Sequence, residues 1–399
     1  MNLILAGMVG LLVVAILVAL LARRLRMPYT VGLVAAGIAS APFTSKLGLT
    51  LSHDLIYLVI LPPLLFEAAI AIHWRELRRD LVPVLVLSTV GVVISAVVVA
   101  AGMAGLLGWP LSAALLFGVL IAATDPVAVI ALFKDLKVEG RLRLLVESES
   151  LFNDGVAAVL FVLVLAWAQM PASPPGILEV AIKLAAISGG GIAVGLLVGA
   201  LVLLLAGRTM DHLVSAALTT VAAYGAFVAA EYFHFSGVLA TVAAGLLIGN
   251  VAVLGQASRN PFSAQEREFV QGFWEFAAFI ANSLIFLLIG VTVAQVPLLG
   301  LGWKSLVVGI GFVLLGRLLT VYPLCLLFAR SRWAIAAHDQ HVLWWGGLRG
   351  ALALALALSL PASLPFAYEI RIAAFAVVIF SVLFQGLTMP LLLRKTGRA

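Results

Sequence analysis

The sequence predicts an all-helical protein that crosses a lipid membrane many times. Hydrophobic residues make up 64% of the 399 residues and charged residues only 11%, whereas about a quarter of the residues in an ordinary soluble domain are charged. The apolar residues form runs of about twenty, the length of one helical crossing. They lack the alternation typical of a membrane β-barrel. These features exclude a soluble globular fold and a barrel.

Thirteen hydrophobic segments are expected to be transmembrane helices, of which the second and the ninth are short. The segments cover residues 2–22, 28–40, 54–72, 81–107, 111–133, 149–168, 177–206, 212–232, 236–251, 269–296, 304–329, 341–360 and 372–393. The first segment has no basic residue before it and no cleavage pattern after it. We therefore expect a retained helix and not a signal peptide.

Basic residues are distributed unevenly between the two sides of this arrangement. Most of the 24 Lys and Arg residues lie in loops after odd-numbered segments or in the tail that follows the last segment. The positive-inside rule places these loops in the cytoplasm. We expect a multi-pass protein of the inner (plasma) membrane, with its N-terminus outside and its C-terminus in the cytoplasm. The net charge of +6 thus reflects orientation and not binding to nucleic acid.

The segments divide into two units of six helices. The first unit covers about residues 2–168, a linking helix covers 177–206, and the second unit covers about 212–393. Because an odd number of crossings separates their starts, the units enter the membrane from opposite sides and are expected to be inverted repeats. We expect a single transmembrane domain over residues 1–399 and no soluble regulatory domain.

Two of the segments, the fifth and the twelfth, are expected to be broken. The fifth contains Asp125 followed by Pro126, which has no N–H and disfavours helical geometry in the residue before it. The twelfth, at the matching position of the second unit, contains the glycine-rich GGLRG (346–350). Broken helices at matching positions of inverted halves mark the binding site of many transporters.

Two carboxylates, Asp125 and Asp154, lie inside segments that are otherwise apolar. An acid within the bilayer is energetically costly, so it indicates a functional site. Thr124, Ser150 and Asn153 add hydroxyl and amide oxygens, and no thiol or imidazole lies near them in the sequence. Such ligands suit a hard cation and not zinc or copper, although a single Ser or Thr in a membrane is more often a helix–helix contact.

Several sequence motifs resemble those of the monovalent cation/proton antiporter-1 family, which includes the NhaP-type sodium/proton antiporters. They are LPPLLFEAAI (61–70), ATDPVAV (123–129), ESLFNDG (149–155), FSGVLATVAAGLLIG (235–249) and WWGGLRGALALALALSLP (344–361). The resemblance implies a thirteen-helix NhaA-like fold, a homodimer, and a core domain that moves against a dimerisation domain. It also implies that Asp154 is the principal ion-binding acid and that Asp125, Thr124 and Ser150 complete a Na+ site. The Asn153–Asp154 pair is similar to that of the electroneutral branch.

Other charged residues within the segments need partners, because buried charges persist when they are paired. We expect an ion pair between Glu149 and Arg317, with Glu149–Arg349 as the second choice. Arg349 is expected to face the carbonyl ends of the broken half-helices, which carry partial negative charge. Glu67 either reaches the cation through water or forms an interhelical hydrogen bond.

The predicted function is exchange of Na+, or of Li+, for H+ in a 1:1 ratio by alternating access. In a dry cavity, desolvation penalises a charged carboxylate, so Asp154 and Asp125 hold either a proton or a cation. The alternatives are a K+/H+ antiporter of the same fold, a sodium-coupled symporter, a channel and an intramembrane aspartyl protease. The protease is disfavoured because its GxGD motif is absent. We expect no enzyme activity, no cofactor, and no soluble partner.

Overall fold

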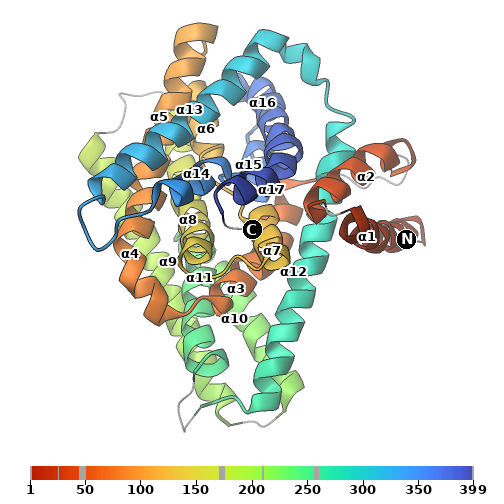
Figure 1. The fold of residues 1–399 in the computed structure, drawn as a ribbon, viewed down its shortest axis with the longest axis vertical. Helices are drawn as coiled ribbons and strands as arrows, with labels where there is room; N and C mark the ends of the chain where they lie inside the picture. Colours follow the sequence, from red (N-terminus) through yellow and green to blue (C-terminus); the bar gives the residue numbers. More distant parts are fainter. Residues whose placement is uncertain are drawn as a thin grey trace.

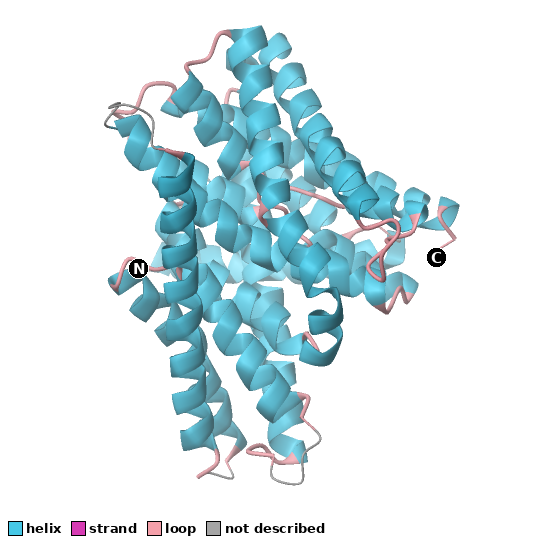
Figure 2. Cartoon of the chain, turned by 90° about the vertical axis from the view of Figure 1, so that its left-hand side faces the viewer, coloured by secondary structure: helices cyan, strands magenta, loops and turns pink. Residues whose placement is uncertain are grey.

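The computed structural model describes residues 2–25, 27–44, 51–169, 176–208, 211–255 and 260–397. All regular elements in these ranges are helical (Figure 2). The first half contains α1 (Asn2–Leu25), α2 (Tyr29–Thr44), η2 (Leu55–Ile60), α3 (Leu61–Ala71), α4 (Trp74–Ser88), α5 (Val90–Leu107), α6 (Leu111–Leu120), α7 (Val127–Leu136) and α8 (Arg141–Gln169).

The second half begins with the long helix α9. It contains α9 (Ile177–Ala206), α10 (His212–Tyr232), α11 (Gly237–Ile248), η3 (Gly249–Val253), α12 (Ala264–Val293), η4 (Leu298–Leu301), α13 (Trp303–Leu327), α14 (Ala337–Trp345), α15 (Ala351–Leu358), α16 (Ala367–Phe380), η5 (Ser381–Gln385) and α17 (Gly386–Lys395).

Helices occupy all the predicted segments, but several begin earlier than hydropathy indicates. α4 begins at Trp74 instead of residue 81, and α8 begins at Arg141 instead of residue 149. Hydropathy marks only the part of a helix that lies in hydrocarbon, whereas backbone hydrogen bonding continues through the charged residues beyond it. α9 and α10 have the predicted bounds, and the Asp211 side chain caps α10 by accepting the Leu213 N–H at 2.8 Å.

Within the described residues, seven helices or continuous helical segments are long and apolar enough to cross a membrane. These are Trp74–Leu107, Arg141–Gln169, Ile177–Ala206, His212–Tyr232, Ala264–Val293, Trp303–Leu327 and Ala367–Lys395. Five shorter apolar helices accompany them: Val9–Ala22, Tyr29–Pro42, Leu55–Ala71, Leu111–Leu120 and Gly237–Val253. The protein is therefore a multi-span, all-helical membrane protein.

The helices form two bundles. The panel comprises α1–α3 and α9–α12: α9, α10 and α11 pack together, α10 and α11 also pack against α3, and α12 packs along α2. At the α2–α12 contact, a Cβ on Gly37 would overlap the Leu287 carbonyl oxygen. The two helix backbones are therefore in close contact, which small residues make possible between membrane helices. The core bundle comprises α4–α8 and α13–α17, in which α5 packs against α6 and α13, and α8 packs against α4. In Figure 1, α1 and α2 lie beside α12 at one edge of the molecule.

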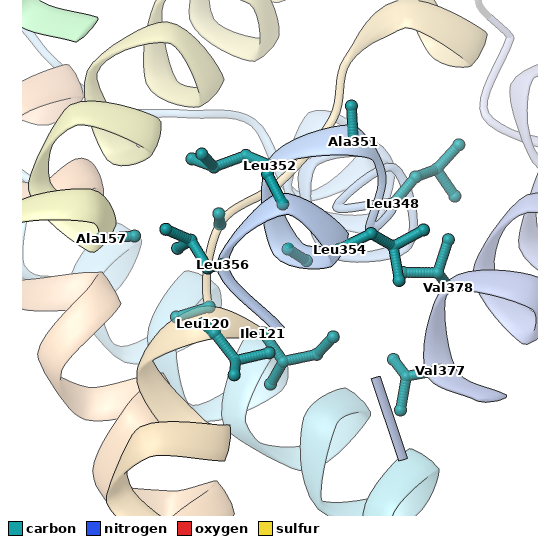
Figure 3. Packing of buried hydrophobic residues seen from close by; sticks show 14 of the residues in the cluster. Leu120, Ile121, Ala157, Leu348, Ala351, Leu352, Leu354, Leu356, Val377 and Val378 are labelled. Carbon is teal, nitrogen blue, oxygen red and sulfur yellow. The ribbon is translucent and has the colours of Figure 1, made fainter. Parts of the chain in front are cut away.

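Both predicted helix breaks are present in the core bundle. α6 ends at Leu120 and α7 begins at Val127, while α14 ends at Trp345 and α15 begins at Ala351. Figure 3 shows the apolar packing around the breaks, where Leu120 and Ile121 lie near α15 and Leu348 and Leu354 point toward Val378 of α16. This packing shields the non-helical backbone from lipid, which is the condition for tolerating such backbone at membrane depth.

Candidate ion-binding site

The two broken helices cross at Asp125. The Asp125 N–H donates to the Leu348 carbonyl at 2.7 Å. A backbone N–H in the α6–α7 break is thus hydrogen-bonded to a backbone carbonyl in the α14–α15 break. Gly350 lies against the Asp125 side chain so closely that a Cβ at residue 350 would overlap the carboxylate. Glycine at this position therefore allows the two extended segments to meet.

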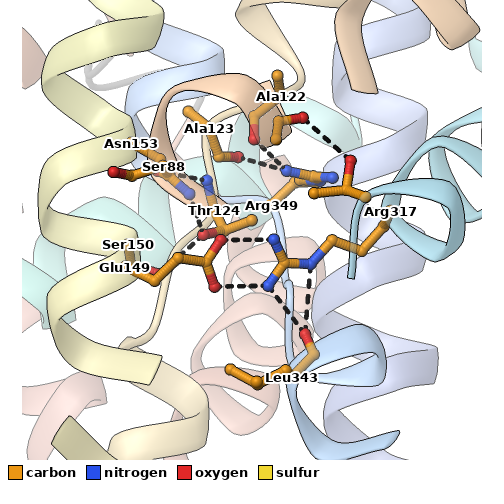
Figure 4. A network of polar contacts seen from close by, with 12 residues as sticks. Ser88, Ala122, Ala123, Thr124, Glu149, Ser150, Asn153, Arg317, Leu343 and Arg349 are labelled. Atoms are coloured by element: carbon orange, nitrogen blue, oxygen red, sulfur yellow. Dashed lines mark hydrogen bonds and ion pairs between the residues drawn. The ribbon is translucent and has the colours of Figure 1, made fainter. Parts of the chain in front are cut away.

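Both half-helix ends at the α6–α7 break are capped. Asp125 Oδ1 accepts the Val127 N–H at the start of α7, at 2.9 Å. At the end of α6, Arg349 Nη1 donates to the carbonyls of Ala122 at 2.5 Å and Ala123 at 3.0 Å (Figure 4). Arg349 thus faces the partial negative charge of a helix C-terminus, as we expected from its place in the sequence.

The neutral oxygen groups form a small network centred on Thr124. Thr124 Oγ1 lies 2.7 Å from Ser150 Oγ and accepts a hydrogen bond from Asn153 Nδ2 at 2.6 Å. The Thr124 N–H donates in turn to Asn153 Oδ1 at 3.2 Å. All three residues are buried. The network fixes the extended segment beside Asp125 against α8.

A cavity of about 900 Å³ contains both aspartates in its lining. Of the other predicted ligands, Thr124 and Glu67 also line it, whereas Ser150 and Asn153 are buried and reach Thr124 instead. Asp125 and Asp154 are partly accessible, in contrast to the buried neutral residues beside them. The carboxylates are therefore the groups that a cation entering the cavity meets.

The cavity also contains charged residues that sequence reasoning did not single out. Glu147, Glu275, Lys134 and Arg394 belong to its lining. Glu147 lies seven residues before Asp154, so both are on one face of α8. The acidic groups of the lining outnumber its two basic ones, which favours cations over anions.

The predicted ion pair between Glu149 and Arg317 is present. The guanidinium binds the carboxylate through two contacts, of 2.5 Å to Oε1 and 2.6 Å to Oε2 (Figure 4), and the two side chains are 7% and 2% exposed. Arg317 also donates to the Leu343 carbonyl at 2.9 Å. The pair therefore connects α8, α13 and α14, and Arg349 is not the partner of Glu149.

A further set of polar residues, on the last helical segment, was missed from the sequence. Ser381, Gln385 and Thr388 contact the backbone or side chains of residues 345 and 349. Their spacing of four and three residues places them on one face of a helix within an otherwise apolar run. This polar stripe was the available sequence signal.

The comparisons with known proteins agree with this geometry. Residues 11–395 match the family described as sodium/hydrogen exchanger, transmembrane. The chain is 40% identical to the Na(+)/H(+) antiporter ApNhaP of Aphanothece halophytica over 376 residues, which are 93% of this chain and 70% of that protein. It is 30% identical to the Na(+)/H(+) antiporter NhaH of Halobacillus aidingensis over 409 residues, or 98% and 97% of the two chains.

The fold is also similar to that of a solved structure. The sodium proton antiporter MjNhaP1 from Methanocaldococcus jannaschii superposes with a TM-score of 0.77, at 22% identity, over 98% of both chains. This similarity shows that the two chains share one overall fold along almost their whole length. Together with the match over almost the whole sequence, it shows that this chain belongs to the transmembrane sodium/hydrogen exchanger family.

Proposed function

We propose that this protein is a secondary active antiporter that exchanges Na+ for H+ across the plasma membrane. The observation that carries the proposal is that Asp125 and Asp154 line one cavity where two broken helices cross. The family relatives named as Na(+)/H(+) antiporters support the same choice of ions.

Competition at a single site accounts for the exchange. A carboxylate in a poorly hydrated cavity favours a neutral state, either protonated or paired with a cation. Asp154 is the principal acid, and Asp125 and Thr124 complete the Na+ site, with Glu67 reaching the ion through water. Ser150 supports the site by holding the Thr124 hydroxyl. Each proton released makes room for one cation, and each cation released restores the proton.

The stoichiometry that we propose is one Na+ for one H+. Asn153 occupies the position beside Asp154, and its amide is committed to Thr124. The amide adds no titratable proton to those of Asp154 and Asp125, and the Asn153–Asp154 pair is similar to that of the electroneutral branch of the family. Exchange would therefore leave no net charge across the membrane.

Alternating access would follow from motion of the core bundle against the panel. Asp125, Asp154 and Thr124 belong to the core bundle, whereas Glu67 belongs to α3 of the panel. The cavity lies between residues of both bundles and reaches Lys134 and Arg394, which belong to the side that we assign to the cytoplasm. We propose that this arrangement is an inward-facing state.

Contacts between loops support the proposed division of odd- and even-numbered loops between the two sides of the membrane. Arg141, after the fifth segment, pairs with Asp80 near the third at 2.7 Å and donates to the Ala334 carbonyl after the eleventh at 2.6 Å. On the opposite side, the ring centroid of Trp109, after the fourth segment, lies 5.6 Å from that of Phe366, after the twelfth. Odd-numbered loops therefore meet odd-numbered loops. We propose thirteen crossings, an outer N-terminus and a cytoplasmic C-terminus.

The remaining architecture is also proposed. Residues 2–168 and 212–393 would form inverted repeats joined by the helix at 177–206, within one transmembrane domain. The panel would form a homodimer in the bilayer through its apolar surface, where exposed leucines such as Leu197 and Leu204 of α9 lie. No cofactor takes part, because the transported ions are the only ligands that the exchange requires.

Everted membrane vesicles with a pH-sensitive dye provide the test of this proposal. Addition of NaCl to respiring vesicles should dissipate the pH gradient. Separate additions of LiCl and KCl show how strongly each of these ions dissipates it in comparison with Na+. Asp154→Asn should abolish the response, because an amide cannot exchange a proton. Asp211→Asn is the matched control, since asparagine can still cap α10 at a distance from the cavity.

Three outcomes would contradict parts of the proposal. If folded Asp154→Asn protein exchanges Na+ at the wild-type rate, the site assignment is wrong. If wild-type vesicles respond to KCl and not to NaCl, the protein is a K+/H+ antiporter. A rate that depends strongly on a clamped membrane potential would instead exclude 1:1 exchange.

A further inference from the structure

We propose that Ser381 and Gln385 are positioning residues that set the affinity of the ion site by holding open the break between α14 and α15. This inference rests on the proposed function, since it assigns a role in cation binding to residues that do not line the cavity. Its basis is a relay of hydrogen bonds that replaces one missing bond of the broken helix.

The two residues lie in the middle of the helical segment Ala367–Lys395. They begin and end the π-helical turn η5, and they are only 1% and 3% exposed. π-helical turns inside α-helices are frequent at functional sites. Two polar side chains at this depth require hydrogen-bond partners, and those partners identify their role.

The partners are the two ends of one broken helical hydrogen bond. In an uninterrupted α-helix the Arg349 N–H would donate to the Trp345 carbonyl, four residues earlier. Here the Arg349 N–H donates to Ser381 Oγ at 3.0 Å, Ser381 donates to Gln385 Oε1 at 2.6 Å, and Gln385 Nε2 donates to the Trp345 carbonyl at 3.0 Å. The Ser381–Gln385 pair is thus inserted between a donor and an acceptor that would otherwise close the helix.

This insertion fixes the residues that contact the ion site. The non-helical segment that it holds in place, residues 346–350, provides the Leu348 carbonyl that accepts the Asp125 N–H at 2.7 Å. It also provides the Arg349 side chain that binds the carbonyls of Ala122 and Ala123. Loss of the relay would let residues 345–349 return toward a helix, which would remove the partner of Asp125.

A purely structural contact between helices makes a different prediction. Such a contact would affect the amount of folded protein and the maximal rate, but not the affinity for the ion. The relay should instead affect the apparent KM for Na+, because Asp125 moves while the fold remains. These two roles are therefore separable by experiment.

The test uses the full-length protein in everted vesicles and in detergent. Ser381→Ala and Gln385→Leu should each raise the KM for Na+ about tenfold, the effect expected for one buried hydrogen bond. Ser381→Thr, which retains the hydroxyl, should remain near the wild-type KM. In the double variant the two effects should not add, because both substitutions break the same relay.

Thermal unfolding in detergent gives a readout that does not depend on transport. Na+ stabilises the wild-type protein if it binds the folded state, and Ser381→Ala should require about tenfold more NaCl for the same rise in Tm. Thr241→Val is the matched control, because Thr241 is a buried hydroxyl of α11 that donates to the Ala223 carbonyl at 3.1 Å, within the panel. Its KM for Na+ should not change.

The outcomes separate this inference from the proposed function. If wild-type protein exchanges Na+ and both variants retain its KM and its NaCl dependence of Tm, the relay does not position the site. Additive effects of the two substitutions on the KM for Na+ in the double variant would also contradict the inference that both residues act through one relay. If the wild-type protein itself shows no Na+ exchange in vesicles, the proposed function fails instead.

Discussion

The buried charges near the site have neighbours that fix their orientation. Glu149 receives two hydrogen bonds from Arg317, and Arg349 binds the carbonyl oxygens of two alanines. The two arginines therefore have different tasks, although both lie deep in apolar segments. Arg317 neutralises an acid and connects three helices, whereas Arg349 stabilises a helix end that the break has left without partners.

The first prediction concerns the ion pair. Glu149→Gln should lower the stability of the protein by about 3 kcal/mol, because removing one partner leaves a buried, uncompensated charge. The double variant Glu149→Leu/Arg317→Met should recover much of this loss, since it removes both charges and retains the volume. The measurement is the Tm of the purified protein in detergent.

Asp211→Asn serves again as a control, because it changes a carboxylate to an amide without leaving a buried charge. A wild-type Tm for Glu149→Gln would show that the pair contributes nothing to stability. A double variant less stable than Glu149→Gln would show that the pair is needed as a pair.

At the scale of helices, the crossing of two breaks creates the site. Pro126 favours a break in the first helix because it lacks an N–H, and the cap that Asp125 gives to Val127 begins α7. The second break has no proline. Its five residues at 346–350 are held by Asp125 from one side and by Ser381 from the other.

The second prediction concerns the glycine at the crossing. Gly350→Ala should abolish Na+-dependent exchange, because the added Cβ overlaps the Asp125 carboxylate. Gly189→Ala is the matched control: Gly189 lies inside α9 with open space around its Cβ position, so alanine there should be neutral or slightly stabilising. The measurements are the exchange rate in everted vesicles and the amount of folded protein in the membrane.

Normal exchange by Gly350→Ala would show that the two segments do not need this close approach. Loss of folded protein in Gly350→Ala, with Gly189→Ala intact, would assign the glycine to folding of the crossing.

At the scale of the whole molecule, residues of the panel and of the core bundle together line one cavity. The lining extends from the aspartates to Lys134 and Arg394, beside the loops joined by Arg141. In the inward-facing state that we propose, Asp125 and Asp154 would be in contact with cytoplasmic water. Movement of the two bundles against each other as rigid units would close this side of the cavity and open the opposite side.

The third prediction tests this accessibility with cysteine labelling. The single native cysteine, Cys325, is buried, so Cys325→Ala gives a background without thiols. In that background Ala131→Cys, in the cavity lining, should react with a membrane-impermeant maleimide in everted vesicles and not in right-side-out vesicles. Excess Na+ should slow the reaction by favouring occupied states.

Ser363→Cys is the control for the opposite side, because Ser363 is exposed in the loop after α15. It should react only in right-side-out vesicles. Labelling of both cysteines from the same side would contradict the proposed orientation, and labelling of Ala131→Cys from both sides would contradict a closed outer face.

The sequence by itself determined the membrane class, the approximate positions of the helices, the two breaks and the need of the buried Glu149 for a basic partner, whereas the structure decided that this partner is Arg317. These follow from local properties: the length of apolar runs, the missing N–H of Pro126, and the cost of a charge without a partner in hydrocarbon. The observed helix starts at Trp74 and Arg141 lie before the predicted ones, because backbone hydrogen bonding extends past the hydrophobic residues.

Only the tertiary structure decided which groups meet. It placed Thr124 in the cavity lining and tied Ser150 and Asn153 to it, brought Gly350 against Asp125, and inserted Ser381 and Gln385 into the second break. These contacts join residues that are far apart in the chain, and those of Ser381 and Gln385 end on backbone groups, which every residue carries. A sequence shows which side chains are polar, but not which unpaired backbone group each of them will reach.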